Sequence, residues 1–263
     1  MSTEQYGVAA KHAQDPAGEL VGSGLIPEDE RARYVRGMFD AIAQRYDLVN
    51  TLLSGGLHRR WKRATVRMLD PSTGGRALDV CCGTGDLAFL LARRVGPTGT
   101  VLGLDVSEGM LSVARRRAGA LRGAGGCCFV QGDAEALPFP DASFDAATIG
   151  FGIRNVGHVE IALREIQRVL RPGGRLAILE FSRPTNGILR GLYDWYSFAV
   201  VPRLGGLVAG HRDAYLYLPT SIRRWPDQPR FAEILAAGGF AGVRYHNLLA
   251  GIATIHTAAR PSA

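Results

Sequence analysis

The sequence predicts an α/β domain in which helices cover both faces of a mostly parallel sheet. Strand-like apolar runs alternate with helical patterns from Arg76 onwards, and the first such run ends in a glycine turn at residues 83–85. A strand, a tight glycine turn and a helix form the first unit of nucleotide-type α/β domains. Two strand-like runs between residues 240 and 258 come last, and they predict an antiparallel edge.

The residues before the sheet predict helices. Residues 1–30 show no hydrophobic periodicity, and we expect a mobile N-terminal segment there. From residue 28 to about residue 68 the pattern is helical, and a break at Gly55 and Gly56 separates a first helix from a second one that carries Trp61 and Val66. The apolar face of the first helix consists of Val35, Met38, Phe39, Ile42, Ala43 and Tyr46.

The alternating elements of the sheet follow in chain order. Short apolar runs predict strands, and longer patterns with helical spacing predict helices. An Arg-Pro-Gly-Gly turn at residues 171–174 separates one helix from the next strand. We expect strands at residues 77–80, 101–105, 128–131, 144–150 and 175–181, and helices at 87–95, 109–121, 159–170 and 231–237.

The glycine turn predicts a cofactor site but leaves two cofactors open. Residues 83–88 fit the pattern G-x-G-x-x-[GA], which is compatible with NAD and with S-adenosylmethionine. Asp79 ends the strand and Asp86 opens the helix. Two carboxylates there would oppose a pyrophosphate and favour the cationic S-adenosylmethionine. Asp105, at the end of the second strand, is placed to accept both ribose hydroxyls of either cofactor.

Composition and charge limit the remaining classes. Hydrophobic residues make up 46% of the chain and charged residues 21%, as in ordinary globular proteins. No apolar run reaches the roughly 18–20 residues of a membrane span, and the polar N-terminus shows no secretory signal. The four cysteines stand in two adjacent pairs without zinc-ligand spacing, so we expect reduced thiols, no metal and a cytoplasmic location. A net charge of +7 admits an anionic partner, but the basic residues are dispersed and we expect no nucleic acid.

Several segments carry a family resemblance. The most specific of them read Tyr-Asp at residues 46–47, Phe-Gly-Ile-Arg-Asn at 151–155 and Tyr-Asp-x-Tyr-Ser-Phe at 193–198. With these segments the chain resembles the quinone-biosynthesis C-methyltransferase family of the menaquinone and ubiquinone pathways, over nearly all of residues 35–257. The matching segments are residues 38–50, 56–63, 78–87, 132–139, 150–155, 179–182, 193–198, 202–203, 215–218, 221–222 and 226–228.

The resemblance implies a fold and a domain organisation. The fold is that of class I S-adenosylmethionine-dependent methyltransferases, a Rossmann-like α/β fold with an antiparallel C-terminal edge and an N-terminal helical lid. Residues 31–260 would form a single methyltransferase domain, with the lid at 31–70 and a substrate-side insertion at 190–228.

The implied reaction is C-methylation of a polyprenylated quinol ring, and the implied substrate is demethylmenaquinol (2-polyprenyl-1,4-naphthoquinol), which becomes menaquinol. Two alternative substrates are phytyl-naphthoquinol and the ring of a ubiquinone precursor. A third alternative is an O- or N-methyltransferase of secondary metabolism. An NAD-dependent oxidoreductase and an RNA-binding module are the other classes left open. A membrane-dissolved substrate implies loose attachment to the inner face of the membrane, and a homodimer is left open.

The predicted cofactor contacts combine the glycine turn with positions carried over from the family. Two features depart from the family pattern. Gly150 stands where serine is common, and Cys81 and Cys82 replace small residues of the turn. The predicted contacts are Asp79, Gly83, Thr84, Gly85, Asp105, Val106, Asp133, Ala134 and Gly150.

The predicted catalytic residues are Arg154, Tyr46, Asp133 and His58. A ring carbon becomes nucleophilic when the neighbouring hydroxyl loses its proton, which calls for a base or a cation. Arg154 is expected to stabilise the phenolate, and it would organise a proton-accepting water with Tyr46 and Asp133. Structural roles remain as alternatives: an ion pair for Arg154, core packing for Tyr46 and helix capping for His58. Residues 193–208 are either a core helix or an entrance for the isoprenoid tail.

Overall fold

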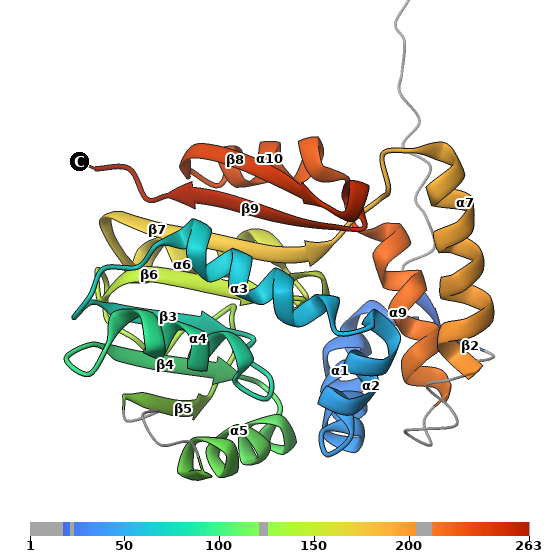
Figure 1. The fold of residues 1–263 in the computed structure, drawn as a ribbon, viewed down its shortest axis with the longest axis horizontal. Helices are drawn as coiled ribbons and strands as arrows, with labels where there is room; N and C mark the ends of the chain where they lie inside the picture. Colours follow the sequence, from blue (N-terminus) through green and yellow to red (C-terminus); the bar gives the residue numbers. More distant parts are fainter. Residues whose placement is uncertain (1–17, 22–23, 121–125, 204–211, 263) are drawn as a thin grey trace, which may run out of the picture.

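The computed structural model describes residues 18–21, 24–120, 126–203 and 212–262, and the seven-stranded sheet they form has the order β5-β4-β3-β6-β7-β9-β8 (Figure 1). The strands from β5 to β7 are parallel, and β9 and β8 are antiparallel to their neighbours. The predicted α/β class and its antiparallel edge are therefore confirmed. The strands are β3 (Arg76–Val80), β4 (Thr100–Asp105), β5 (Cys127–Gln131), β6 (Phe144–Gly150), β7 (Leu170–Phe181), β8 (Ala241–Leu248) and β9 (Ala253–Ala259).

Helices cover both faces of the sheet. Successive residues of a strand point to opposite faces. Accordingly, Ala77 of β3 packs with Leu91 in a cluster on one face, whereas Leu78 packs with Leu163 and Phe231 in the larger cluster on the other. The helices of the first face are α3 (Leu57–Leu69) and α4 (Asp86–Val95), those of the second are α6 (Val159–Val169) and α10 (Gln228–Ala237), and α5 (Glu108–Ala120) packs beside β5.

The first predicted helix is divided in two. Helix α1 (Glu28–Ile42) ends before Tyr46, and Tyr46 is the first residue of α2 (Tyr46–Ser54). The Arg45 N–H donates to the Ile42 carbonyl in the turn between them. The end of α1 is fixed to α5, because Asp40 accepts from the Ser107 hydroxyl at 2.6 Å and from the Gly109 N–H at 2.9 Å. The turn between Ile42 and Tyr46 separates α1 from α2, so the two are distinct helices.

Two further segments differ from the expected elements. Residues 18–27 were expected to lack regular structure, and they form an antiparallel pair of strands, β1 (Gly18–Val21) and β2 (Gly24–Pro27). The expected mobility of residues 1–17 concerns a segment outside the described residues. The turn at 171–174 lies within the bounds of β7, where pairing with β6 passes from Leu170 directly to Arg175. Gly173, with a φ of 75°, permits that excursion.

A group of helices stands beyond the carboxyl ends of the parallel strands, on the right in Figure 1. It comprises α1, α2, α7 (Gly187–Trp195), the π-helical segment η2 (Tyr196–Val200) and α9 (Arg212–Arg224). In open parallel sheets this edge is where ligands bind. In the described part of the chain, no helix has both the length and the apolar character needed to cross a membrane.

Candidate active site

Two adjoining cavities lie at this edge of the sheet. The first, which we name the turn cavity, lies against the glycine turn between β3 and α4. The second, the apolar cavity, has a volume of about 470 Å³ and is lined mainly by residues of α2, α3, α7, η2 and α9. The boundary between them consists of the residues that line both, namely Phe39, Tyr46, Lys62 and Phe151. A ligand in one cavity would therefore meet a ligand in the other at these side chains.

Seven of the nine predicted cofactor contacts line the turn cavity, and Asp79 and Gly85 do not. A Cβ on Gly85 would stand 3.0 Å from ring atoms of Phe89 and Phe129, so this glycine is required by aromatic packing. A Cβ on Gly150 would stand 2.6 Å from Cδ1 of Leu87, so a side chain at this position would require the Leu87 side chain to move. The seven contacts that line the cavity are Gly83, Thr84, Asp105, Val106, Asp133, Ala134 and Gly150.

Asp105 holds the glycine turn while facing the turn cavity. Its carboxylate accepts from the Gly83 N–H at 2.7 Å and from the Ser107 N–H at 2.9 Å. Burial raises the pKa of Asp105, and these two N–H groups oppose the rise. Each carboxylate oxygen can accept more than one hydrogen bond. Asp105 therefore retains acceptor capacity for hydroxyl groups of a ligand.

The carboxylates of Asp79 and Asp86 do not line the turn cavity. Asp79 is fully buried, where it accepts from the Thr148 hydroxyl at 2.7 Å and the Ala88 N–H at 3.0 Å. Burial raises the pKa of Asp79 to about 7. Asp86 forms ion pairs with Lys62 at 2.9 Å and Arg117 at 2.6 Å. The sequence argument for a cationic cofactor thus rested on two carboxylates that have other partners.

Other carboxylates make the turn cavity acidic. Asp105, Asp133 and Glu135 line it, whereas the cation that lines it, Lys62, is paired with Asp86. Such a lining opposes a pyrophosphate and suits the ammonium and sulfonium charges of S-adenosylmethionine. The residues present therefore fit this cofactor.

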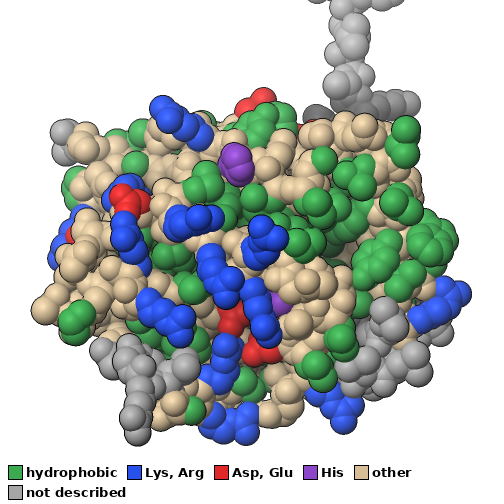
Figure 2. Space-filling view, viewed as in Figure 1, with side chains coloured by type: hydrophobic (Ala, Val, Ile, Leu, Met, Phe, Trp, Pro, Cys, Tyr) green, Lys and Arg blue, Asp and Glu red, His purple; other side chains and the backbone are tan. Residues whose placement is uncertain are grey.

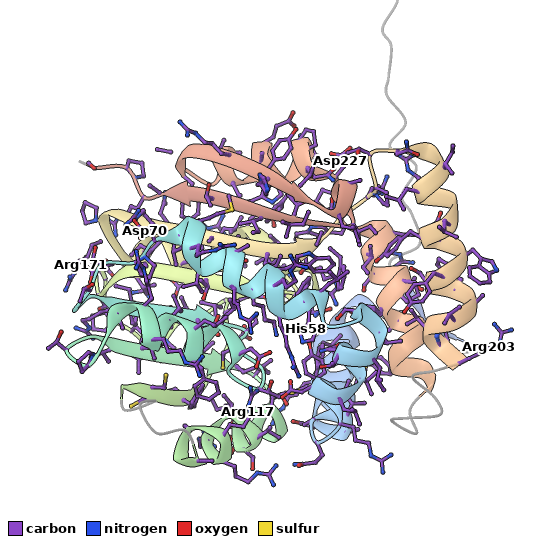
Figure 3. The ribbon with its side chains drawn as sticks, viewed as in Figure 1. His58, Asp70, Arg117, Arg171, Arg203 and Asp227 are labelled. Carbon is purple, nitrogen blue, oxygen red and sulfur yellow. The ribbon has the colours of Figure 1, made fainter. Side chains whose placement is uncertain are left out.

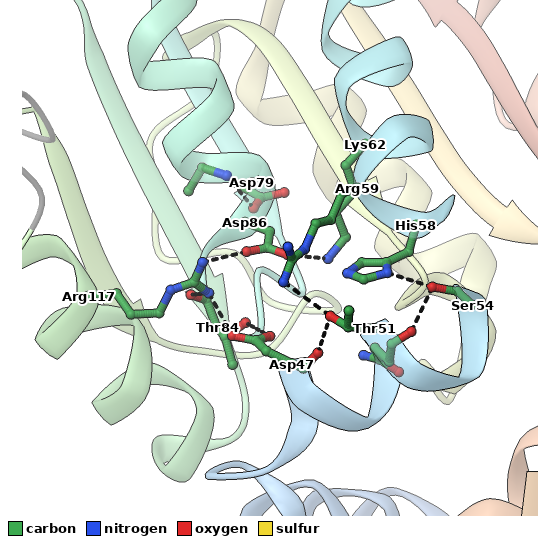
Figure 4. Close-up of polar contacts among 12 residues, drawn as sticks. Asp47, Thr51, Ser54, His58, Arg59, Lys62, Asp79, Thr84, Asp86 and Arg117 are labelled. Atoms are coloured by element: carbon green, nitrogen blue, oxygen red, sulfur yellow. Dashed lines mark hydrogen bonds and ion pairs between the residues drawn. The ribbon is translucent and has the colours of Figure 1, made fainter. Parts of the chain in front are cut away.

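A chain of charged side chains connects α2 to the glycine turn and to α5 (Figure 4). Asp47, beside Tyr46 on α2, accepts from the Thr84 hydroxyl at 2.7 Å and pairs with Arg117 at 3.0 Å. Arg117 also donates to the Thr84 carbonyl at 2.8 Å. Asp86 pairs with both Arg117 and Lys62, and these ion pairs connect the same group of side chains to α3. These contacts place α2 directly over the predicted cofactor contact Thr84.

Arg154 lies in η1 (Ile153–Asn155), just after β6, and lines the apolar cavity. Its Nη1 donates to Glu180 at 2.6 Å and to the Phe151 carbonyl at 2.8 Å, and both side chains are buried. Burial alone would lower the pKa of Arg154, but Glu180 raises it above its ordinary value. Among the described residues no group accepts from Nη2 at hydrogen-bonding distance. The ion pair expected as a structural alternative is therefore present, and it leaves the two N–H groups of Nη2 for a ligand.

Tyr46 and Phe151 stand at the boundary between the cavities. Burial raises the pKa of Tyr46, and the nearby charges of Lys62 and Arg154 oppose that rise. Phe151 has a φ of 60°, a left-handed conformation that costs on the order of 1–3 kcal/mol for a residue with a side chain. Such strain persists where the surrounding structure imposes it, and here it sets the ring of Phe151 between the two cavities.

His58 lies on α3 beside α2 (Figure 3) and lines the apolar cavity. Its Nδ1 is 2.7 Å from the Ser54 hydroxyl, which itself donates to the Asn50 carbonyl at 2.6 Å. Because a hydroxyl has one hydrogen, Nδ1 carries the proton and donates to Ser54. Burial, and then Lys62, lower the pKa of His58 to about 4. His58 is therefore neutral near pH 7 and adds no positive charge to the cavity.

We expect the lowered pKa of His58 to appear in the pH dependence of stability. Folding favours the neutral imidazole, so its contribution is present above pH 6.5 and is lost as the pH falls through about 4. The loss in free energy of unfolding would reach about 3 kcal/mol at full protonation. Urea unfolding of the wild type and of His58→Gln between pH 7 and pH 4 measures it. Equal losses in the two proteins would contradict the assignment.

The sequence did not identify Lys62 or Asp47 as site residues. Lys62 follows His58 by four positions on α3, and this spacing puts both on the same helical face. Within the described residues, no three His, Cys, Asp or Glu side chains gather in a way that could hold a metal ion.

The chain is similar in sequence to known proteins over most of its length. The family model described as "ubiE/COQ5 methyltransferase family" matches residues 27–260. A ubiquinone/menaquinone biosynthesis C-methyltransferase from Pseudomonas fluorescens is 48% identical over 236 residues, which cover 90% of this chain and 92% of that protein. A protein of the same name from Azotobacter vinelandii is 48% identical over 240 residues, which cover 91% of this chain and 95% of that protein.

Solved structures share the fold at low identity. The [4+2]-cyclase SpnF superposes with a TM-score of 0.66 at 20% identity and covers 94% of this chain and 100% of its own. The YcgJ protein of Bacillus subtilis superposes with a TM-score of 0.58 at 19% identity. The match covers 78% of this chain and 99% of that protein. The fold that the sequence predicted is thus confirmed. The sequence match over most of its length shows that the chain belongs to the ubiE/COQ5 methyltransferase family and uses S-adenosylmethionine as its methyl donor.

Proposed function

We propose that this C-methyltransferase methylates a ring carbon of a polyprenylated quinol, and that the substrate is demethylmenaquinol, which becomes menaquinol. The observation that carries the proposal is the apolar cavity, which adjoins the turn cavity and holds an aromatic wall beside Arg154. The names of the relatives, which refer to ubiquinone/menaquinone biosynthesis, support a quinol substrate.

The aromatic wall consists of Phe151, Phe181 and Trp61. The rings of Phe151 and Phe181 are 4.5 Å apart, and both lie 6.4 Å from Trp61. The Arg154 guanidinium carbon stands 5.6 Å from the Phe181 ring centre. A flat aromatic ring binds well against such a surface, and a hydroxyl on that ring could then reach Arg154.

The turn cavity would hold the methyl donor through Thr84, Asp105, Val106, Asp133 and Ala134. When bound, S-adenosylmethionine supplies an electrophilic methyl group on a sulfonium. We assign Asp79 and Gly85 to the support of the turn, since neither lines the cavity.

The substrate must become a phenolate before its ring carbon attacks. A phenol has a pKa near 10, so a nearby positive charge is needed to favour ionisation near pH 7. Arg154 lines the apolar cavity, and it keeps its proton because Glu180 raises its pKa. Arg154 would therefore bind the phenolate oxygen.

The hydroxyl proton would pass to a water held by Tyr46 and Arg154, since both line the apolar cavity. Asp133 lines the turn cavity but not the apolar cavity, so we assign it to cofactor binding rather than to proton transfer. His58, neutral and bonded to Ser54, would orient the substrate by accepting a hydrogen bond at Nε2.

Residues 31–70 and 190–228 would act as the lid and the substrate-side insertion. Both segments supply lining of the apolar cavity, for example Leu53 and His58 from the first and Tyr193 and Ile222 from the second. A homodimer remains a prediction.

The test is incubation with labelled S-adenosylmethionine and a panel of demethylated quinols, followed by mass analysis. The panel contains a 2-polyprenyl-naphthoquinol, its phytyl analogue and a polyprenyl-methoxybenzoquinol. We expect a C-methyl product from the naphthoquinol at the highest rate. Preference for the benzoquinol would assign the ubiquinone precursor instead. A product that carries the labelled methyl group on a hydroxyl oxygen, as a methyl ether, would contradict C-methylation.

Activity should require the reduced ring. A quinone has no hydroxyl to ionise, so its ring carbon is not activated toward a methyl donor. Turnover is expected with the quinol under anaerobic conditions and should fall to background with the quinone unless a reductant is added. Equal turnover of the quinone without a reductant would refute the phenolate mechanism.

A further inference from the structure

We propose that helix α7 docks on an anionic lipid bilayer and that the apolar cavity opens toward the bilayer beside this helix. The proposal rests on the proposed function, because it gives the isoprenoid tail of the substrate a route into the site that avoids water.

One face of α7 is apolar and exposed. Ile188, Leu192 and Trp195 follow one another at helical spacing, with exposed fractions of 86%, 59% and 62%. No residue of α7 is buried, although the helix is strongly amphipathic in sequence. Hydrophobic side chains gather over this part of the molecule in Figure 2. A contiguous exposed apolar row of this kind marks a surface that binds an apolar partner.

This apolar row is continuous with the interior of the apolar cavity. Leu192 and Trp195 line the cavity although more than half of each is exposed to solvent. Leu249, in η3 (Leu249–Gly251), does the same with an exposed fraction of 53%. Side chains that are both exposed and part of the lining must stand at the mouth. A lipid tail that enters between them would pass from one apolar environment to another.

The charge of the segment that contains α7 favours an anionic surface. Among the described side chains of residues 183–224, arginines outnumber carboxylates, and the acidic group Asp194 is paired with Arg223 at 3.1 Å. Arg183, Arg190 and Arg203 donate to backbone carbonyls, which leaves their charge uncompensated. Arg203 projects outward at the end of this group of helices (Figure 3). Each such cation favours an anionic bilayer by about 1 kcal/mol near its surface.

A second copy of the chain is the competing occupant of this face. In a pair joined through α7, the uncompensated arginines of both copies would stand close together and repel one another. The charge therefore favours a lipid surface.

The test uses the tryptophan emission of the full chain. The sequence has three tryptophans, and Trp61 and Trp225 are buried, so Trp195 is the one that a vesicle surface can reach. Phosphatidylcholine vesicles with phosphatidylglycerol should shift its emission to the blue, and lipids brominated on their chains should quench it. Pure phosphatidylcholine should bind more weakly, and added salt should release the protein.

Two substitutions keep the lining intact while they weaken docking. Ile188→Ser removes an apolar side chain that does not line either cavity, and the vesicle partition coefficient should fall about tenfold. Arg203→Gln should lower partition into anionic vesicles about fivefold. The matched control is Met68→Ser at the carboxyl end of α3, away from α7 in Figure 1, whose exposed fraction is 40%. It should bind as the wild type does.

Three results would overturn the proposal. The first is the absence of an emission shift with anionic vesicles, and the second is an equal fall in the vesicle partition coefficient for Ile188→Ser and Met68→Ser. The third is a blue shift without lipid that depends on protein concentration, which would indicate that a second copy binds this face. Methylation of a quinol with a short, water-soluble tail separates docking from function. If Ile188→Ser keeps full turnover of it and loses vesicle binding, both proposals stand. If the wild type methylates no quinol, the proposed function fails while the vesicle result still decides the docking.

Discussion

An Arg154→Ala variant is expected to lose about 10²–10³ in kcat while its affinity for S-adenosylmethionine stays nearly unchanged. Arg154 lines the apolar cavity but not the turn cavity, so the substitution removes a contact to the quinol oxygen and leaves the cofactor contacts in place. Single-turnover kinetics with the preferred quinol, together with calorimetry of cofactor binding, measure the two quantities. Arg154→Lys should recover only part of the rate, because a point charge does not replace the planar fork.

The buried ion pair complicates this variant, and a second substitution resolves it. Removal of Arg154 leaves Glu180 buried without its partner, which costs about 3–5 kcal/mol of stability. The double variant Arg154→Ala/Glu180→Gln removes the unpaired charge and should recover much of that loss. If the double variant is stable and still slow, the effect on kcat belongs to the phenolate contact. Full turnover of a stable double variant would show that Arg154 is only a structural partner of Glu180.

An Asp105→Ala variant should bind S-adenosylmethionine about 1.5–3 kcal/mol more weakly, the usual cost of losing charged hydrogen bonds. That corresponds to about a 10–100-fold rise in Kd. The side chain faces the turn cavity and also accepts from the Gly83 and Ser107 N–H groups, so both the ligand and the turn lose acceptors. S-adenosylhomocysteine lacks the positive charge of the sulfonium. Calorimetry with this ligand therefore measures the part of the lost binding free energy that is due to hydrogen bonding.

Asp105→Asn serves as the matched control, because it preserves shape and one acceptor oxygen. Its loss of affinity should be intermediate. Its thermal stability should fall below that of the wild type, because both carboxylate oxygens accept from backbone N–H groups and the new NH2 group would face one of these donors. Unchanged affinity in Asp105→Ala would remove Asp105 from the cofactor site.

The sequence predicted the sheet well because the signals there are local. The glycine turn, the apolar strands and the Arg-Pro-Gly-Gly turn each act over a few residues, and all these elements lie near their expected positions. The break between α1 and α2 was missed, since apolar residues continue at helical spacing from Val35 to Tyr46 across it. The contacts of Asp40 with Ser107 and Gly109, near the end of α1, join residues far apart in sequence and could not be inferred from it.

The site shows the same division. Gly83, Thr84 and Asp105 follow from the positions where strands end, and the structure brings them to one cavity. The role of Asp86 could not be inferred, because its partners Lys62 and Arg117 lie 24 and 31 positions away. A carboxylate at a helix start can face a ligand or a neighbouring cation, and only tertiary structure distinguishes the two.

The aromatic wall of the apolar cavity has a consequence for how the chain folds during synthesis. Trp61, Phe151 and Phe181 pack with Ile252 and Ile255, so a residue near the start of the domain depends on the last strand, β9. Contacts across such long sequence separations form late, because ordering the intervening chain is costly in entropy. While β9 is still in the ribosome, the nascent chain can complete its glycine turn but not the surface that receives the quinol ring. The ability to bind a donor would therefore arise before the ability to use it.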